Sequence, residues 1–211
     1  GVDRIADTDQ VSFGVTSRIL DVATGRDLVA ATIGQIRYLS SSGVLLPDQT
    51  LLTTASSDYV AKLSFLLNRN INFDLGHQWG SSSTGTTQSE ARIQYAPSSN
   101  KVLNLAYRFR RDSLEQGDLS WSWPLGNHWN FVGRYNYSLR DDEALEQFFG
   151  LEYESCCWGL RLVSRRHIST RDGTQDSSIG LQLILKGMAS VGTAADKILE
   201  RGILGYSADI R

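Results

Sequence analysis

The chain has 211 residues, with 21 Lys and Arg against 23 Asp and Glu, so its formal net charge is −2. This balance lacks the basic excess of a nucleic-acid-binding protein, and nucleic acid is not an expected partner. Apolar residues make up 41% of the chain, which argues against overall disorder. No apolar run approaches the ~18 residues of a transmembrane helix. The sequence begins at Gly1 with neither Met nor a signal peptide, which suggests a processed or cut chain.

Alternation of apolar and polar residues is the dominant pattern. From Ile71 to Trp79, the odd positions carry large apolar or aromatic side chains and His77, and the even positions are polar or Gly. This period of two predicts strands with one apolar and one polar face. Most of these strands approach the ~9–11 residues of a tilted strand that spans a bilayer. The predicted strands are residues 10–20, 28–39, 58–67, 71–79, 86–96, 101–110, 117–125, 129–139, 144–154, 157–167 and 177–186.

The connections between these strands alternate between short and long after the second strand. The short ones are 68–70, 97–100, 126–128 and 154–156. The mostly longer ones, rich in Ser, Thr, Gly and Asp, are 40–57, 80–85, 111–116, 140–143 and 168–176. Outer-membrane barrels have tight periplasmic turns and longer external loops. We therefore expect the turn at 154–156 on the periplasmic side.

These patterns predict an all-β fold. Residues 1–186 are expected to form an antiparallel transmembrane β-barrel segment of about eleven strands, in the outer membrane of a Gram-negative bacterium. An odd count places Gly1 on the external side, whereas bacterial barrels have an even number of strands and both termini in the periplasm. We therefore expect further strands upstream, so that this chain is the C-terminal part of a larger barrel.

Aromatic residues with a polar atom gather near the strand ends, as in the interfacial girdles of membrane proteins. A soluble β core with large side chains is the alternative interpretation. The residues are Tyr38, Tyr59, Trp79, Tyr95, Trp123, Trp129, Tyr153 and Trp158.

The alternation ends after Lys186. Residues 187–211 are predicted to form a periplasmic C-terminal tail with a short helix, for which Thr193 is the N-cap and Gly202 the C-cap. We expect this helix to lie against the periplasmic rim of the barrel or to plug it.

Cys156 and Cys157 are adjacent and are the only cysteines in the sequence. Neighbours in an extended strand point to opposite faces, and a bond between them would need a strained ring. Exposed thiols do not normally stay free in an oxidising periplasm, so each thiol would need a partner from outside this chain. Two inert buried thiols are the alternative. A metal site is not predicted, because no other Cys or His lies close in sequence on that turn.

Arginines recur on the predicted polar faces. A cluster of them in a barrel lumen could hold the phosphates of a glycolipid or the carboxylates of a plug protein. The favoured interpretation pairs them with Asp74, Glu90, Glu146 and Glu152 on the same face, because barrel lumens are polar in general. The candidate lumen arginines are Arg92, Arg108, Arg110, Arg134, Arg161 and Arg165.

Signals for catalysis are weak. His77, His128 and His167 are scattered, and no Ser, His and acid have a spacing that suggests a triad. No Gly-rich phosphate loop precedes a helix. We therefore expect a protein without enzymatic activity, catalytic residues, cofactor or metal.

Three motifs resemble those of a known family. Glu154-Ser155-Cys156-Cys157-Trp158, between two amphipathic strands, resembles the vicinal-cysteine turn of the LPS-assembly protein LptD family. Residues 1–7 resemble the start of that family's later barrel strands, and residues 200–206 resemble its end. The resemblance spans essentially the whole chain.

The resemblance implies a large outer-membrane barrel with a periplasmic N-terminal domain. It implies that Cys156 and Cys157 bond separately to two cysteines of that domain. Implied partners are lipopolysaccharide, outer-membrane lipid, an LptE-like lipoprotein plug, and an LptA-like periplasmic bridge protein that binds through the N-terminal domain. Lipopolysaccharide would leave through a seam between the first and last strands. The predicted last strand carries the lipid-facing residues Ile179, Leu181, Leu183 and Leu185.

The expected function is therefore non-enzymatic insertion of lipopolysaccharide into the outer leaflet of the outer membrane. A general porin or solute-transporter barrel is one alternative, and it would have no use for two long-range cysteine links. A soluble β-sandwich binding module is another, and it would fold alone in water. A barrel enzyme is a third, and it would lose hydrolase activity on a single Ser or His substitution.

Overall fold

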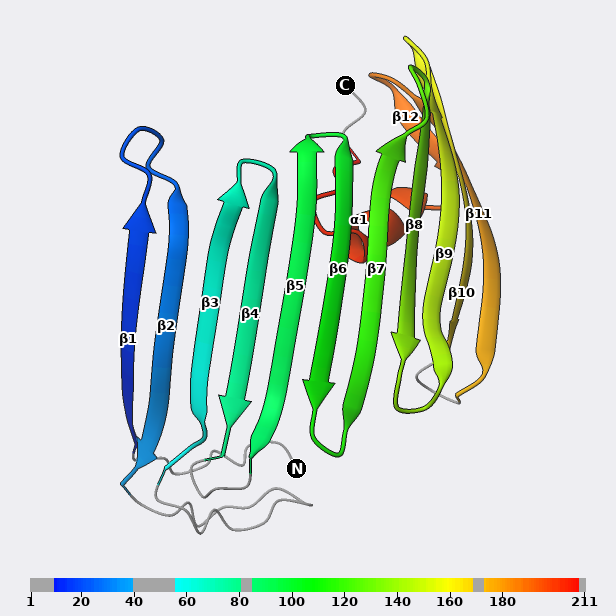
Figure 1. The fold of residues 1–211 in the computed structure, drawn as a ribbon. Helices are drawn as coiled ribbons and strands as arrows, with labels where there is room; N and C mark the ends of the chain where they lie inside the picture. Colours follow the sequence, from blue (N-terminus) through cyan, green and yellow to red (C-terminus); the bar gives the residue numbers. More distant parts are fainter. Residues whose placement is uncertain (1–9, 40–55, 81–84, 169–172, 209–211) are drawn as a thin grey trace.

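The computed structural model describes residues 10–39, 56–80, 85–168 and 173–208. It consists of one twelve-stranded antiparallel sheet, with the strands in chain order, and one short helix (Figure 1). The predicted all-β fold is confirmed. The motif at residues 1–7, most of the connection 40–57 and the side chain of Tyr38 lie outside the described residues.

Each strand hydrogen-bonds to its sequence neighbours. The strands are β1 Gln10–Leu20, β2 Asp27–Tyr38, β3 Tyr59–Asn68, β4 Ile71–Trp79, β5 Thr86–Ser98, β6 Lys101–Arg110, β7 Leu114–Pro124, β8 Trp129–Ser138, β9 Glu143–Glu154, β10 Trp158–Ile168, β11 Gln175–Leu185 and β12 Ala189–Gly192. The helix α1 is Ala195–Gly202. Strands β1 to β11 match the eleven predicted segments within a few residues. The structure therefore has one more strand than expected, the four-residue β12 in the tail.

The helix differs from the prediction at both ends. Ala194 precedes its first turn and makes no side-chain cap, and the helix includes Gly202 and ends before Ile203. Thr193 is not a cap, because its hydroxyl and amide bond to the backbone of Leu181 on β11. The expected helix is present, but the hydrogen bonds of Thr193 go to the sheet.

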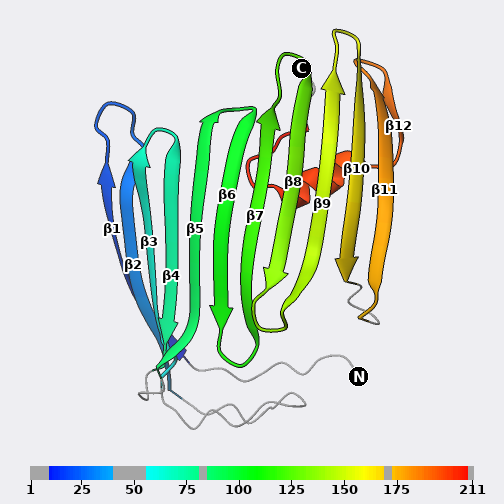
Figure 2. The same ribbon diagram turned by 45° about the vertical axis from the view of Figure 1, so that its right-hand side comes forward.

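The sheet curves, so that it has a convex and a concave side. Figure 1 shows that the sheet bends back at its right-hand edge, where β10 and β11 lie, and Figures 1 and 2 show α1 on the concave side. The connections 21–26, 69–70, 99–100, 125–128, 155–157 and 186–188 all lie at one end of the sheet, which we call the short-turn end. Of the described helices, none has the length and apolar character to cross a membrane.

The convex face is apolar and exposed, and the concave face is largely shielded and mostly polar, with one apolar cluster beneath the tail. Leu105 on β6 is 52% exposed and pairs in register with Ile93 on β5 and Leu119 on β7. On the concave face, Asn104 of the same strand is buried and pairs with Ser120. A protein in water would show the opposite arrangement. It is the arrangement of a sheet whose convex side faces hydrocarbon.

A small apolar core lies where the tail meets the concave face. Leu199 and Ile203 of the tail pack against strand residues, and all members of this cluster are buried. The cluster contains Val102, Val132, Phe148, Val163, Ala195, Leu199 and Ile203. The tail residues are therefore an integral part of the packing on this face.

Aromatic rings cluster on the strands near the short-turn end. Trp129 and Tyr153 meet edge to face with ring centroids 4.9 Å apart, and Trp158 lies 5.0 Å from Tyr153. At the opposite end of the sheet, Tyr59 and Trp79 stack at 5.5 Å. Two aromatic bands separated by an apolar stretch are typical of a membrane-spanning sheet.

Candidate functional site

The cysteine turn, residues 155–157, connects β9 to β10 at the short-turn end. Cys156 and Cys157 are both exposed, and their sulfur atoms lie 2.8 Å apart without a covalent bond. The sequence placed Cys157 in a strand, where neighbouring side chains diverge. The strand begins one residue later, at Trp158, and within the turn the two sulfur atoms lie within hydrogen-bond distance of each other. The expectation of diverging side chains was therefore wrong for this pair.

The cysteine turn, with the adjoining Glu154, is hydrogen-bonded to the β7–β8 turn on one side and to the β11–β12 turn on the other. The amide of Ser155 donates to the carbonyl of Trp158 at 2.9 Å, and the amide of Lys186 donates to the carbonyl of Cys157 at 3.0 Å. The Lys186 ammonium also forms a 2.6 Å ion pair with Glu154. On the other side, the amide of Glu154 donates to the carbonyl of His128 at 2.8 Å. The turn is thus fixed by the ends of β8 and β11 as well as by its own hairpin.

The two thiols differ in acidity. A hydrogen bond from Cys157 lowers the pKa of Cys156, with further contributions from Ser155 and the Lys186 charge. The same hydrogen bond raises the pKa of Cys157. Because the thiolate is the reactive form, Cys156 is the better nucleophile of the pair near neutral pH.

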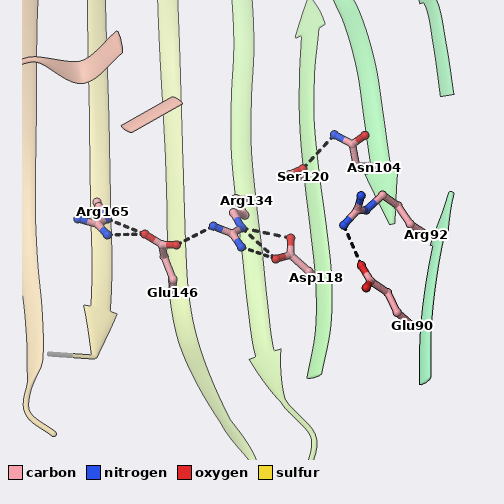
Figure 3. A network of polar contacts seen from close by, with 8 residues as sticks. All are labelled: Glu90, Arg92, Asn104, Asp118, Ser120, Arg134, Glu146 and Arg165. Carbon is pink, nitrogen blue, oxygen red and sulfur yellow. Dashed lines mark hydrogen bonds and ion pairs between the residues drawn. The ribbon is translucent and has the colours of Figure 1, made fainter. Parts of the chain in front are cut away.

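A row of alternating charges crosses the concave face (Figure 3). Arg165 on β10 pairs with Glu146 on β9 at 2.6 Å, and Glu146 pairs with Arg134 on β8 at 2.9 Å. Arg134 also donates hydrogen bonds from Nε and Nη2 to the carboxylate of Asp118 on β7. We call these four residues the charge row. Asp118 was not among the acids that the sequence analysis had chosen.

A second buried ion pair lies closer to the cysteine turn. Arg161 on β10 donates from Nε to Glu152 on β9 at 2.7 Å. Its Nη2 atom donates to the carbonyl of Ala208 in the tail at 2.9 Å. Glu152 also accepts from Asn130 at 2.7 Å and from the hydroxyl of Tyr206 at 2.5 Å. Burial, together with the Glu152 charge, raises the pKa of Tyr206, so its hydroxyl stays protonated and donates.

The remaining candidate arginines are less constrained. Arg92 pairs with Glu90 at 2.9 Å, with both side chains partly exposed (Figure 3). Arg110 donates to Gln88 at 3.2 Å, and Arg108 makes no ion pair with any described residue. Asp74, expected to pair with an arginine, instead accepts from Ser64 and Asn72. Four of the six candidate arginines are thus held by carboxylates.

The predicted lipid-facing residues of the last strand lie on β11 and are exposed. Ile179 is the most open at 77%. The neighbouring β12 covers only residues 182–185 of this edge, because Gly192, with φ of 112°, and Thr193 turn the chain toward the concave side. Leu183 and Leu185 therefore have strand partners on both sides, whereas Ile179 has one only on β10 among the described residues.

Neither a metal site nor a histidine site forms in the described part of the chain. No three His, Cys, Asp or Glu side chains gather there in a way that could hold a metal ion. His77 lies on the convex face against Ser89, and His128 bonds the carbonyl of Glu154. These partners give both rings ordinary structural roles.

Comparison with known proteins agrees with this geometry. The family described as LptD, LPS transport system D, matches residues 1–159. The chain belongs to the LptD family. The LptD match covers most of the sheet and includes the cysteine turn.

Several curated relatives are named LPS-assembly protein LptD. One from Xylella fastidiosa strain Temecula1 is 38% identical over 99% of this chain. One from Nitrosococcus oceani is 36% identical over 98%, and one from Xanthomonas oryzae pv. oryzae is 35% identical over 99%. The match lies in the C-terminal portion of these relatives. The chain spans about a quarter of their length, 27–28%.

Proposed function

We propose that this chain is part of an outer-membrane β-barrel that delivers lipopolysaccharide to the outer leaflet. The observation that carries the proposal is the inverted sheet, apolar and exposed on its convex side and polar on its concave side. It is supported by the relatives that are named for LPS assembly. Lipopolysaccharide has sugars that need water and acyl chains that need hydrocarbon. A polar lumen beside an apolar exterior suits both parts of the molecule.

The proposed orientation has the short-turn end in the periplasm. Barrels of this kind have tight periplasmic turns and longer external loops. The cysteine turn would then face the periplasm, where thiols oxidise. We propose that Cys156 and Cys157 form separate disulfides with two cysteines upstream in the full-length protein. Their exposure in the structure supports this, because a partner can reach both sulfur atoms.

The concave face is proposed to line the lumen. The charge row and the Arg161–Glu152 pair would have a structural role there, since their charges are already matched. Arg108 and Arg110 have no carboxylate partner among the described residues and are the candidates to meet phosphates of the transported glycolipid. Residues Ile179, Leu181, Leu183 and Leu185 would face lipid beside the seam through which the molecule leaves.

The proposed partners belong to the same machinery. An LptE-like lipoprotein would plug the lumen of the complete barrel, and an LptA-like bridge protein would deliver lipopolysaccharide through the upstream periplasmic domain. The function is proposed to be transport without covalent chemistry. A β-sandwich would need a second sheet packed on the first, and the described residues form a single sheet.

Disulfide mapping on the full-length protein from purified membranes tests the proposal. Peptides from a non-reducing digest are identified by mass spectrometry. Separate links from Cys156 and Cys157 to two upstream cysteines are expected. Two free thiols, or a bond between the pair, would contradict the proposed assembly barrel and favour a porin. Delivery of lipopolysaccharide to the cell surface is then scored in cells that depend on the Cys156→Ser, Cys157→Ser double variant, where a loss is expected.

A further inference from the structure

The tail contacts the concave face through both apolar packing and hydrogen bonds. Its apolar side inserts Leu199 and Ile203 between strand residues, and Gly202 lies directly against the ring of Phe148 on β9. A Cβ at position 202 would overlap that ring. This close approach shows that the helix end is fitted to the concave face.

Polar side chains of the sheet bond the tail backbone along its length. The carbonyl of Leu204 accepts from Asn104 at 2.9 Å and from Gln94 at 3.2 Å, and the carbonyl of Ala208 accepts from Arg161 at 2.9 Å. At the other end, Gln182 accepts from the amide of Asp196 at 3.2 Å. The donors and acceptors come from β5, β6, β10 and β11. The tail therefore links the paired strands β5 and β6 to the paired strands β10 and β11, which lie further along the sheet.

The tail also reaches the end of the hairpin that carries the cysteine turn. Tyr206 bonds Glu152, which lies two residues before Glu154 and is paired with Arg161. Glu154, just before the cysteine turn, forms an ion pair with Lys186 and donates its amide to the carbonyl of His128. The hydrogen bond from Tyr206 thus ends at Glu152, and two residues of β9 backbone connect Glu152 to Glu154, which precedes Ser155.

We propose that residues 193–208 form an internal clamp that holds the end of the β9–β10 hairpin, and with it the cysteine turn, in position. We call this segment the tail clamp. Tyr206 is a positioning residue that acts on the thiols through Glu152. The inference concerns contacts within this chain and does not depend on which molecule the barrel transports.

Hydrogen–deuterium exchange on the full-length protein in lipid nanodiscs tests the clamp. The protein is reduced, so that no disulfide restrains the turn. The amide of Ser155 reports on the cysteine turn through its bond to Trp158, and the amide of Asn70, bonded to Asn68 in the β3–β4 turn, is the internal reference. The β3–β4 turn lies at the same end of the sheet, and the hydrogen bonds between the tail and β5, β6, β9, β10 and β11 do not reach it.

Ile203→Asp and Leu204→Asp form a matched pair. Ile203 is fully buried, whereas the neighbouring Leu204 side chain is 51% exposed. The first variant is expected to raise exchange at residues 199–206 and at Ser155 about tenfold or more, while Asn70 stays unchanged. The second is expected to change none of these rates.

Two results would overturn the inference. Faster exchange in the tail with an unchanged rate at Ser155 would show that the tail does not hold the turn. Unchanged exchange in the tail of Ile203→Asp would show that the tail is not clamped. If Ile203→Asp fails to fold, Tyr206→Phe removes only the hydroxyl. Loss of one hydrogen bond to a carboxylate predicts a rise of about tenfold at Ser155, and no rise would equally refute the clamp.

Discussion

Arg161 and Glu152 form a 2.7 Å ion pair on the concave face, and both side chains are almost completely shielded from solvent. Removing one partner of such a pair leaves a buried charge without compensation. We expect Arg161→Met to lower the free energy of unfolding by about 3–5 kcal/mol. Urea unfolding of the full-length protein in lipid vesicles measures this loss. Arg92→Met is the control, because its pair with Glu90 is partly exposed and is expected to contribute less than about 1 kcal/mol. Equal losses in the two variants would contradict this assignment.

Leu105 and Arg108 lie on opposite faces of β6 and test which face meets lipid. Leu105→Arg places a charge in the proposed hydrocarbon region and is expected to cost about 2–4 kcal/mol. Arg108→Gln changes a side chain of the concave face that has no ion pair to any described residue, and it is expected to cost less than about 1 kcal/mol. Folding titrations into vesicles compare the two. If both cost the same, the convex face does not face lipid.

The cysteine pair predicts a pH-dependent difference in reactivity. The hydrogen bond from Cys157 lowers the pKa of Cys156, so Cys157→Ala should raise that pKa and slow alkylation of Cys156 at pH 7. The rate is expected to fall tenfold for each unit by which the pKa rises, because the thiolate reacts. The difference should vanish at a pH high enough to ionise both forms.

Cys156→Ala is the reciprocal control for this experiment. The pKa of Cys157 is raised by Cys156, so Cys157 should react faster at neutral pH once its neighbour is removed. Iodoacetamide labelling of the reduced protein across pH, followed by mass spectrometry, gives both profiles. Identical profiles with and without the neighbour would show that the thiols do not interact.

Gly150 on β9 marks a close approach on the concave face. A Cβ there would lie 2.9 Å from the carbonyl of Leu162 and 2.9 Å from a methyl of Val132, so a neighbour must shift. Gly150→Ala is expected to destabilise the sheet by about 1–3 kcal/mol through overpacking. Gly117→Ala on β7 is the control, because nothing lies within 4 Å of its Cβ position. It should leave the urea midpoint unchanged or raise it slightly, and a drop equal to that of Gly150→Ala would refute the packing argument.

Strands β1 to β11 could be predicted because a period of two over about ten residues recurs along the chain, although it is less regular in β2 and β3. The strand β12 could not, since its four residues, Ala189–Gly192, are too few to show alternation. It forms because Gly187, with φ of 78°, allows a tight turn after β11. The turn reverses the chain, so that β12 pairs with the free edge of β11. A short strand of this kind depends on its neighbour rather than on its own pattern.

The partners of the inner-face side chains were predicted only in part. Glu146 and Glu152 pair with arginines as expected: Glu152 lies directly opposite Arg161, whereas Glu146 lies opposite Asn136 and His167 and reaches Arg134 and Arg165 diagonally. Asp118 was missed although it lies within the predicted seventh strand; it stands opposite Asn136 and reaches Arg134 diagonally, and no pattern in the sequence indicates such a contact. The bonds from Tyr206 and Thr193 to the sheet were not predicted. They join residues far apart in sequence, and no local pattern encodes such contacts.

The alternation of sign along the charge row has a consequence for the electric field beyond the concave face. The charges of Arg165, Glu146, Arg134 and Asp118 cancel, so the row is a chain of short dipoles. Beyond a Debye length of about 8 Å its field is small at physiological ionic strength. An anionic molecule passing along this stretch would therefore be neither trapped nor repelled by it. The ion pairs of the charge row join β7, β8, β9 and β10, and these cross-strand contacts oppose flattening of the curved sheet.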